Sequence, residues 1–249
     1  MDFGRTAGDY ARYRTTFPPE FFARLAAMGV GIAGQRIVDL GTGTGVLARG
    51  FAAAGCMVTG VDIAPELLDQ ARQQDVGPYL LAPAEDAGLP AQAWDVVSAG
   101  QCWHWFDHER ALAEARRLLV AGGALVVCYR DYLVVPGDVC ALSEDLVLRY
   151  HPDWPMAKGG GIGPQWAVGL GWTGFDRVDT VTFDITVAFT HEAWRGRMRS
   201  SNGVGASLSA ADVAAFDADL ARLLRERFPE EPLMVPHRIW ALTARRTQA

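Results

Sequence analysis

The sequence predicts an α/β fold of the doubly wound type, in which a parallel sheet is covered by helices on both faces. Short apolar strands alternate with helical segments through the first half of the chain. A glycine-rich turn, 41–45, separates the first strand from the helix that follows it. The second strand ends in an acid, Asp62, about 20 residues beyond these glycines, which is the spacing of doubly wound ligand sites.

Apolar periodicity and the residues that start or stop each segment assign the elements. We predict strands over 37–40, 56–62, 79–82, 94–100, 124–129, 179–189 and 235–244. We predict helices over 20–28, 46–51, 65–72, 109–120 and 211–228. Pro65 suits a first helical turn because it has no backbone donor to satisfy. Gly122-Gly123 is expected to break the helix over 109–120.

The length and composition of the chain indicate one domain with a cap. Its 249 residues, 50% of them hydrophobic, can bury one large core. We divide them into an N-terminal lid (1–34), a cofactor-binding core (35–130), a cap insertion (131–175) and C-terminal strands with a helix (176–249). The insertion is rich in Trp, Gly and Pro and has no clear periodicity, as is typical of a functional lid or binding loop.

Charge and cysteine usage limit the possible partners. A net charge of −6 and a pI near 5.4 disfavour a nucleic-acid substrate, so we expect a small-molecule acceptor. The chain shows no signal pattern and no uninterrupted long apolar run, so we expect a soluble, cytoplasmic protein without membrane contact. Its four cysteines and five histidines form no ligand cluster, which argues against a disulfide or a metal. The sequence does not specify an oligomeric state.

The glycine turn indicates which kind of cofactor binds. A dinucleotide fingerprint needs its third glycine where the chain has Val46, and here that glycine is Gly45. An acid directly before the turn, Asp39, is also unusual for a dinucleotide site. The run Ile37-Val38-Asp39-Leu40-Gly41-Thr42-Gly43-Thr44-Gly45 instead resembles motif I of the class I S-adenosylmethionine-dependent methyltransferases. The glycines would let the backbone approach the ligand closely.

Parallel strands collect ligand contacts beyond their carboxyl ends, and several candidate residues fall there. We expect Asp62 to accept hydrogen bonds from ribose hydroxyls. The segment 83–86 resembles the part of the family that lies at the adenine edge, where Glu85 or Asp86 accepts from the exocyclic amine, unless these acids only solvate a loop. The candidate cofactor-binding residues of these strand ends are Asp39, Gly41, Thr42, Gly43, Asp62, Ile63, Ala84, Glu85, Gln101 and Trp105.

The N-terminal segment resembles the part of the family that reads Tyr-Arg-Pro, with Thr15 in place of the proline. The resemblance implies that Arg14 reaches the methionine carboxylate of the cofactor, a planar match of two parallel hydrogen bonds. Tyr13 is expected beside the cofactor and Tyr10 beside the substrate, both packing over the crevice. A solvated surface arginine is the alternative for Arg14.

The segment after the fourth strand, 101–107, resembles the small-molecule branch of the family, methyltransferase type 11, which includes enzymes like trans-aconitate and juvenile-hormone-acid methyltransferases. The resemblance places its residues between the sulfonium and the acceptor. His104 is the candidate catalytic base, because an imidazole titrates near neutral pH, and it is also placed beside the substrate with Trp103. Alternatively, His104 only hydrogen-bonds a loop carbonyl.

Other candidate substrate-binding residues are Tyr132 and Trp166 in the cap and Arg195 and Arg199 beyond the sixth strand. Helical spacing would place the two arginines on one face, where they either clamp an anionic substrate or form a solvated surface. The resemblance also implies a Rossmann-like sheet of seven strands, mostly parallel, with the last strand inserted antiparallel between the fifth and sixth.

The resemblance thus implies methyl transfer from S-adenosyl-L-methionine to an oxygen, nitrogen or carbon nucleophile. A carboxylate acceptor is already ionised and needs no base, whereas a phenol, alcohol or amine depends more on His104. Two alternatives stay open: an S-adenosylmethionine-binding enzyme of the same fold with other chemistry, and a non-catalytic cofactor-binding subunit. Intact Asp39, Gly41, Gly43 and Asp62 argue against the subunit.

Overall fold

A computed structural model describes residues 16–73, 77–157, 159, 161–168 and 170–247. The chain divides into two compact units. The core unit contains Thr16–Arg130, Gly163–Phe183 and 239–247. The helical unit contains Asp131–Ile162 and Asp184–Arg238 among its described residues. Each unit is described by itself below.

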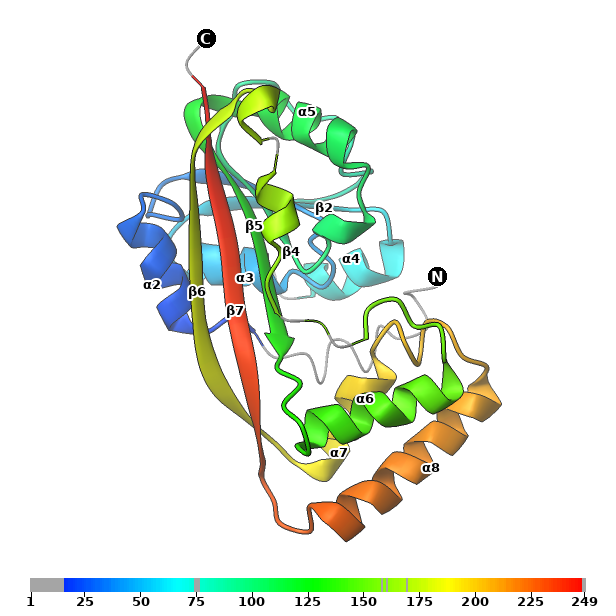
Figure 1. The fold of residues 1–249 in the computed structure, drawn as a ribbon. Coiled ribbons are helices and arrows are strands. Elements are labelled where there is room, and N and C mark those ends of the chain that lie inside the picture. The colour runs from blue at the N-terminus through cyan, green and yellow to red at the C-terminus, as the bar shows by residue number, and fades with distance from the viewer. Residues whose placement is uncertain (1–15, 74–76, 158, 160, 169, 248–249) are drawn as a thin grey trace. The chain divides into compact units, whose positions relative to one another are not determined.

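The strands form a seven-stranded sheet in the order β3-β2-β1-β4-β5-β7-β6 (Figure 1). The bounds are β1 Arg36–Leu40, β2 Met57–Asp62, β3 Tyr79–Leu81, β4 Trp94–Gly100, β5 Leu119–Tyr132, β6 Phe175–Phe189 and β7 Leu233–Arg246. The first five strands pair in parallel. β7 runs antiparallel to β5, because Arg246 bonds to the carbonyl of Leu119 while Leu133 donates to Pro236. The predicted mostly parallel sheet with a reversed last strand is confirmed.

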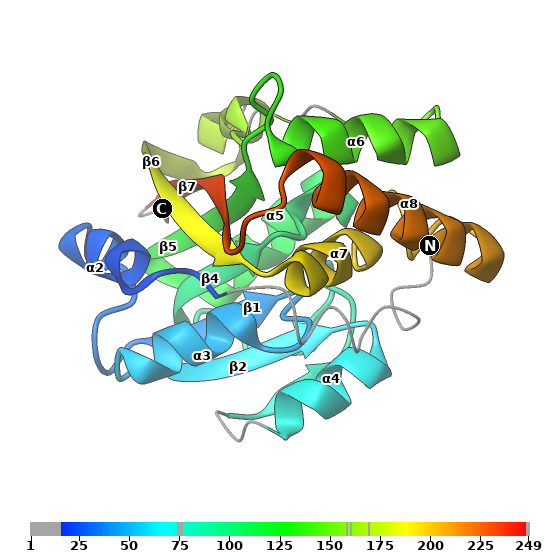
Figure 2. The same ribbon diagram turned by 90° about the horizontal axis from the view of Figure 1, so that it is seen from below.

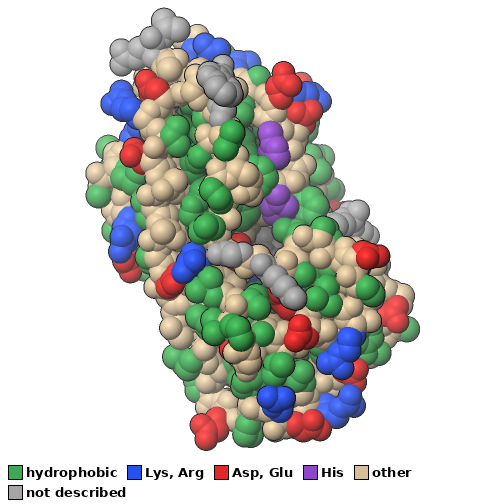
Figure 3. Space-filling model, in the orientation of Figure 1, with side chains coloured by type: hydrophobic (Ala, Val, Ile, Leu, Met, Phe, Trp, Pro, Cys, Tyr) green, Lys and Arg blue, Asp and Glu red, His purple; other side chains and the backbone are tan. Residues whose placement is uncertain are grey.

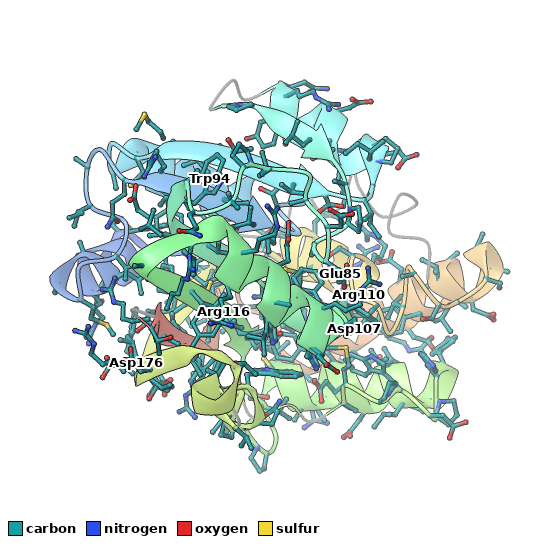
Figure 4. All side chains as sticks on the ribbon, turned by 90° about the horizontal axis from the view of Figure 1, so that it is seen from above. Glu85, Trp94, Asp107, Arg110, Arg116 and Asp176 are labelled. Atoms are coloured by element: carbon teal, nitrogen blue, oxygen red, sulfur yellow. The ribbon has the colours of Figure 1, made fainter. Side chains whose placement is uncertain are left out.

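Helices cover both faces of the sheet in the core unit. The bounds are α2 Pro19–Ala27, α3 Val46–Ala53, α4 Pro65–Arg72 and α5 His108–Leu118. α3 contacts β1 and β2, and α4 contacts β2 and β3, on the side seen in Figure 2. α5 contacts β4 and lies in front of the sheet in the opposite view of Figure 4. This arrangement confirms the doubly wound class, with an apolar core built around residues such as Leu40, Val97 and Leu125.

The helical unit has its own apolar core. Its helices are α6 Val139–Tyr150, α7 His191–Arg199 and α8 Ala210–Arg227, and α8 contacts both of the others. The fully buried side chains of Trp194 and Phe216 lie in this core. Each helix begins at a side-chain cap that accepts a backbone N–H, which satisfies one of the unpaired donors of the first turn. The capping residues are Asp138, Thr190 and Ser209.

The prediction that Gly122-Gly123 breaks a helix is wrong. α5 ends at Leu118 and β5 begins at the next residue, so both glycines lie inside the strand. They fall where the pairing of β5 with β4 shifts register. A Cβ at Gly123 would lie 3.0 Å from the carbonyl oxygen of Val120 and 3.1 Å from that of Asp95. These glycines therefore allow a close backbone approach at a bulge.

The expectation of an aperiodic stretch over 131–175 missed α6. The inner face of this helix carries Ser143 and Glu144, both buried, beside apolar residues such as Val139 and Val147. Polar residues on the buried face weaken the apolar pattern that identifies an amphipathic helix. The helical unit also includes residues 184–238, so its compact core extends beyond the proposed insertion.

Candidate cofactor and acceptor site

The carboxyl ends of β1, β2 and β4 meet at one edge of the sheet in the core unit. These strands are neighbours in parallel register and end at Leu40, Asp62 and Gly100. Most of the candidate cofactor-binding residues lie at the ends of these strands or in the segments that follow them, and Ala84 and Glu85 follow β3. Ligands of open α/β sheets bind at this edge, so the structure brings these residues together where the sequence placed them.

The turn after β1 leaves open space above its middle glycine. Gly41, Gly43 and Gly45 have φ angles of 64°, 56° and 75°, a region that glycine adopts without strain. A Cβ at Gly41 would lie only 2.7 Å from the Sγ atom of Cys102, so that glycine packs against protein. A Cβ at Gly43 would meet no heavy atom of the described residues within 4 Å. Gly43 therefore presents bare backbone to a space that a ligand can fill.

Asp62 fastens this turn to the end of β2. Its Oδ2 atom accepts the Gly43 N–H at 2.8 Å and its Oδ1 atom accepts the Ala64 N–H at 2.9 Å. Burial raises the pKa of Asp62, although these backbone hydrogen bonds oppose the shift. Each carboxylate oxygen keeps a further lone pair, so Asp62 can still accept hydrogen bonds from a ligand. The apolar side chain of Ile63, 72% exposed, follows it.

The carboxylate of Asp39 is buried and accepts hydrogen bonds from other side chains of the protein. Its Oδ2 atom accepts from the Thr42 hydroxyl and its Oδ1 atom from the Ser98 hydroxyl, both at 2.7 Å. Burial raises the pKa of Asp39 to about 6, against the effect of these two hydrogen bonds. The sequence placed Asp39 and Thr42 on the cofactor. Their hydrogen bonds shape the turn, and a cofactor role for either residue stays a prediction. Ser98 was missed, although it is a polar residue in an apolar strand and the register partner of Asp39.

Glu85, in the loop after β3, lies beside the start of α5. Its Oε1 atom accepts the backbone N–H of Asp107 at 2.9 Å, and Figure 4 shows it beside Asp107 and Arg110. Ala84, before it, is buried in the core, and Asp86, after it, is exposed. The second carboxylate oxygen of Glu85 keeps its acceptor capacity. The choice between Glu85 and Asp86 as the partner of an exocyclic amine stays a prediction.

The segment after β4 turns its two tryptophans in different directions. Gln101 has a left-handed φ of 66° and its side-chain amide donates to the carbonyl of Arg130. Trp105 is 44% exposed, as a cofactor or acceptor contact requires. Trp103 is only 2% exposed and packs against Phe106 in the core. The packing of the Trp103 ring gives no support to a substrate contact, and that role stays a prediction.

His104 contacts a tyrosine that the sequence analysis did not identify. The hydroxyl oxygen of Tyr129 lies 3.1 Å from the backbone nitrogen of His104 and 3.1 Å from its Nδ1 atom. The centroid of the His104 ring is 4.5 Å from that of Trp105. Tyr129 lies near the end of β5, and a polar residue at a strand end is the signal that could have found it.

Tyr132 is buried within the helical unit. Its hydroxyl donates to the Oε1 atom of Glu144 at 3.0 Å, and its ring packs edge-on against Trp194. The guanidinium of Arg197 lies 5.4 Å from the centre of the same ring. Burial raises the pKa of Tyr132 well above its ordinary value, and the Glu144 charge raises it further. The proposed substrate role of Tyr132 is not tested by these contacts.

Arg195 and Arg199 do share a helix face, and both bind acids of their own unit. The Nε atom of Arg195 donates to Asp217 at 3.0 Å and Nη1 of Arg199 donates to it at 2.6 Å. Glu192 pairs with both arginines. The anion-clamp interpretation loses support, because carboxylates of α7 and α8 already engage these guanidinium groups.

The remaining candidate site residues are Trp166 and three residues of the N-terminal segment. Trp166, in the core unit, has its ring centroid 4.7 Å from that of His108 and packs at the edge of the apolar core. Tyr10, Tyr13 and Arg14 lie outside the described residues.

Side chains of both charges are interspersed over the face shown in Figure 3. A membrane-spanning helix would have to be longer and more apolar than any helix in the described part of the chain.

Comparison with known proteins identifies the domain. Residues 38–127 match a family model described as a methyltransferase domain. An uncharacterized methyltransferase of Mycobacterium tuberculosis is 39% identical over 128 residues, covering 50% of each chain. The malonyl-[acyl-carrier protein] O-methyltransferase of Serratia marcescens is 35% identical over 126 residues, covering 50% of this chain and 49% of that protein. The chain thus spans about half the length of the curated relatives it matches.

A solved structure extends the likeness to the whole fold. A protein described as a type II methyltransferase of Anaeromyxobacter dehalogenans has a TM-score of 0.71 and 25% identity, covering 95% of this chain and all of that one. The fold is that of a doubly wound domain, with its candidate cofactor site beyond the strand ends. Residues 38–127 match the methyltransferase domain model, and the chain resembles the class I S-adenosylmethionine-dependent methyltransferases.

Proposed function

We propose that this protein transfers a methyl group from S-adenosyl-L-methionine to a small-molecule acceptor. The observation that carries the proposal is the space above Gly43, which no described residue fills, in a turn that Asp62 fastens to β2. Bare backbone beside a carboxylate with spare lone pairs fits the amino-acid and ribose portions of such a cofactor. The methyltransferase relatives support the same interpretation.

The residues proposed to hold the cofactor have distinct tasks. Gly41 and Gly43 shape the turn, Asp39 and Thr42 fix its conformation, and Asp62 accepts from the ribose hydroxyls. Ile63, Ala84 and Glu85 flank the adenine, and Gln101 and Trp105 lie toward the sulfonium. Tyr13 and Arg14 are assigned from the sequence resemblance alone.

The bound cofactor supplies a methyl group already activated by a positive sulfur. The protein then has to align the acceptor, exclude water and manage any proton that the acceptor loses. The exposed ring of Trp105 can attract a sulfonium as aromatic faces attract other cations. His104 is proposed to contact the acceptor, with Tyr132 and Trp166 as further candidates. A cytoplasmic location stays part of the proposal.

Calorimetry followed by an acceptor screen tests the function. We expect the purified chain to bind S-adenosylmethionine and its demethylated product, and to form that product together with an acceptor one methyl heavier. Binding without any methylated acceptor, but with another change in acceptor structure, would favour different chemistry on the same fold. Absence of binding in a folded protein would overturn the proposal.

A further inference from the structure

We propose that Glu114 is a positioning residue that holds the segment 82–93, between β3 and β4, where its acids can meet the adenine of the cofactor. The inference rests on the proposed function, which places the cofactor at this edge of the sheet. Glu114 acts through the backbone of Ala87, which it holds, rather than by contact with the cofactor. All residues that carry the inference belong to the core unit.

The segment 82–93 is attached to α5 near both ends of that helix. Its residues form neither helix nor strand, so no ladder of backbone hydrogen bonds fixes their conformation. The N–H of Gln92 donates to the carbonyl of Arg117 at 2.9 Å. At the other end of α5, Glu85 accepts the N–H of Asp107 at 2.9 Å (Figure 4). The middle of the segment therefore needs an attachment of its own.

Glu114 provides this middle attachment. Its Oε1 atom accepts the N–H of Ala87 at 3.0 Å and Nη2 of Arg117 at 2.8 Å. Its Oε2 atom accepts Nε of Arg117 at 2.6 Å. Nη2 of Arg117 also donates to the carbonyl of Leu89 at 2.8 Å. One ion pair on α5 therefore holds two backbone groups of the segment.

The carboxylate of Glu114 is buried and ionised. Glu114 is 6% exposed and Ala87 is 3% exposed. Burial raises the pKa of Glu114, but hydrogen bonds from Arg117 and Ala87 outweigh it, so the pKa lies below its ordinary value. A buried charge is costly unless it is paired and hydrogen-bonded, so the bond to Ala87 is strongly favoured over its loss. The position of Ala87 is therefore closely specified.

The two acids that are candidates for the adenine amine directly precede Ala87 in the chain. Because Glu85 and Asp86 are its neighbours, a shift of Ala87 carries them with it. A hydrogen bond tolerates little displacement, since its heavy atoms lie about 2.7–3.2 Å apart. Glu114 should therefore control how well the protein recognises the exocyclic amine of adenine.

Binding of two ligands that differ at the exocyclic amine tests the inference. The probes are S-adenosylhomocysteine and its deaminated analogue, which carries an oxygen in place of that amine. Each is titrated into the whole chain by calorimetry. We expect wild type to prefer the amine by about 10-fold or more, the value of a hydrogen bond to a charged group. The readout is the ratio of the two affinities, because a general loss of stability lowers both affinities together.

Two substitutions separate the reach of Glu114 from its charge. Glu114→Gln loses the charge but keeps an oxygen that can accept from Ala87, so its ratio should stay within about 2-fold of wild type. Glu114→Asp keeps the charge for Arg117 but is one methylene shorter, so its ratio should fall to about 3-fold or less. Asp95→Ala is the matched control, because Asp95 also accepts a backbone N–H and pairs with an arginine, Arg36, at the opposite end of the strands. It should leave the ratio unchanged.

The outcomes separate this inference from the proposed function. A wild type that binds both ligands without preferring the amine would overturn the inference alone. A Glu114→Asp ratio equal to that of wild type, or an equal loss in Glu114→Gln and Glu114→Asp, would do the same. Failure of folded wild type to bind either ligand would overturn the proposed function and this inference with it.

Discussion

The core unit and the helical unit use their polar side chains differently. In the core unit, Asp62 and Glu85 accept backbone N–H groups at or beyond strand ends and keep lone pairs for a ligand. In the helical unit, the polar side chains between α7 and α8 pair with one another, as Asp217 does with Arg195 and Arg199. The first pattern leaves a site that a cofactor can complete, whereas the second stabilises the packing of helices.

The largest effect is expected from a side chain placed in the space above Gly43. Gly43→Val should abolish cofactor binding, because the side chain would occupy the space that the ligand needs. The φ of 56° should also cost about 1–2 kcal/mol of stability for any side chain. Calorimetry with S-adenosylmethionine measures the loss, and thermal unfolding checks the fold.

Gly88→Val is the matched control for Gly43→Val. Gly88 belongs to the same unit, has a φ of 66°, and its Cβ would also meet no heavy atom of the described residues within 4 Å. It should show a similar loss of stability with unchanged binding. Normal turnover by folded Gly43→Val would place the cofactor elsewhere.

A smaller loss is expected from the carboxylate that completes the site. Asp62→Ala should weaken binding of S-adenosylmethionine by about 30-fold or more, since two charge-assisted hydrogen bonds disappear at a cost of ~2–4 kcal/mol. Asp95→Ala is the control, because Asp95 also accepts a backbone N–H, from Arg36, but lies at the opposite end of the strands. Equal affinities in wild type and Asp62→Ala would remove Asp62 from the ribose.

The difference between residues at strand ends and residues paired across the fold also explains what could be predicted from the sequence. The glycine turn and Asp62 were found because strand ends and backbone geometry follow from local pattern. Ser98 and Tyr129 were missed because their partners, Asp39 and His104, depend on strand register and side-chain direction.

Similar limits apply to helices and aromatic residues. α6 was hidden because Ser143 and Glu144 occupy its buried face. Trp103 and Trp105 share one short turn, and only the structure shows that Trp103 is buried and Trp105 is exposed. Local pattern identifies such residues but does not assign the side on which each one lies.

Asp39 is an acid of the core unit that differs from Asp62 and Glu85, because its carboxylate accepts hydrogen bonds from two side-chain hydroxyls. Its pKa of about 6 exceeds the ordinary value, so its contribution to stability is present below about pH 4 and is lost as the pH rises through about 6. Asp39→Asn stays neutral and can keep both hydroxyl partners, since each hydroxyl can donate or accept. We expect the variant to gain about 1–3 kcal/mol relative to wild type between pH 4 and 8.

Denaturant unfolding of wild type and Asp39→Asn at several pH values measures this difference. Subtraction of the two curves removes the titration of the other acids to a first approximation. A pH-independent difference would show that Asp39 titrates normally, and the turn would then not depend on a strained buried carboxyl.

The smallest effect tests whether the arginines of α7 are structural. Burial raises the pKa of Asp217, but hydrogen bonds from Arg195 and Arg199 outweigh it, so the pKa lies below the ordinary value. An acid whose pKa is lowered in the folded state stabilises the protein at pH values above its ordinary pKa. This stabilisation is lost as the pH falls through the pKa of the folded state. Arg195→Ala should therefore cost about 1–2 kcal/mol of unfolding free energy at neutral pH, less in acid, and leave the apparent acceptor constant unchanged.

Arg222→Ala, which removes an exposed pair with Asp219 on α8, is the control and should cost no more than about 0.5 kcal/mol. A raised acceptor constant with unchanged unfolding free energy in Arg195→Ala would restore the anion clamp, and the helical unit would then hold a binding site after all.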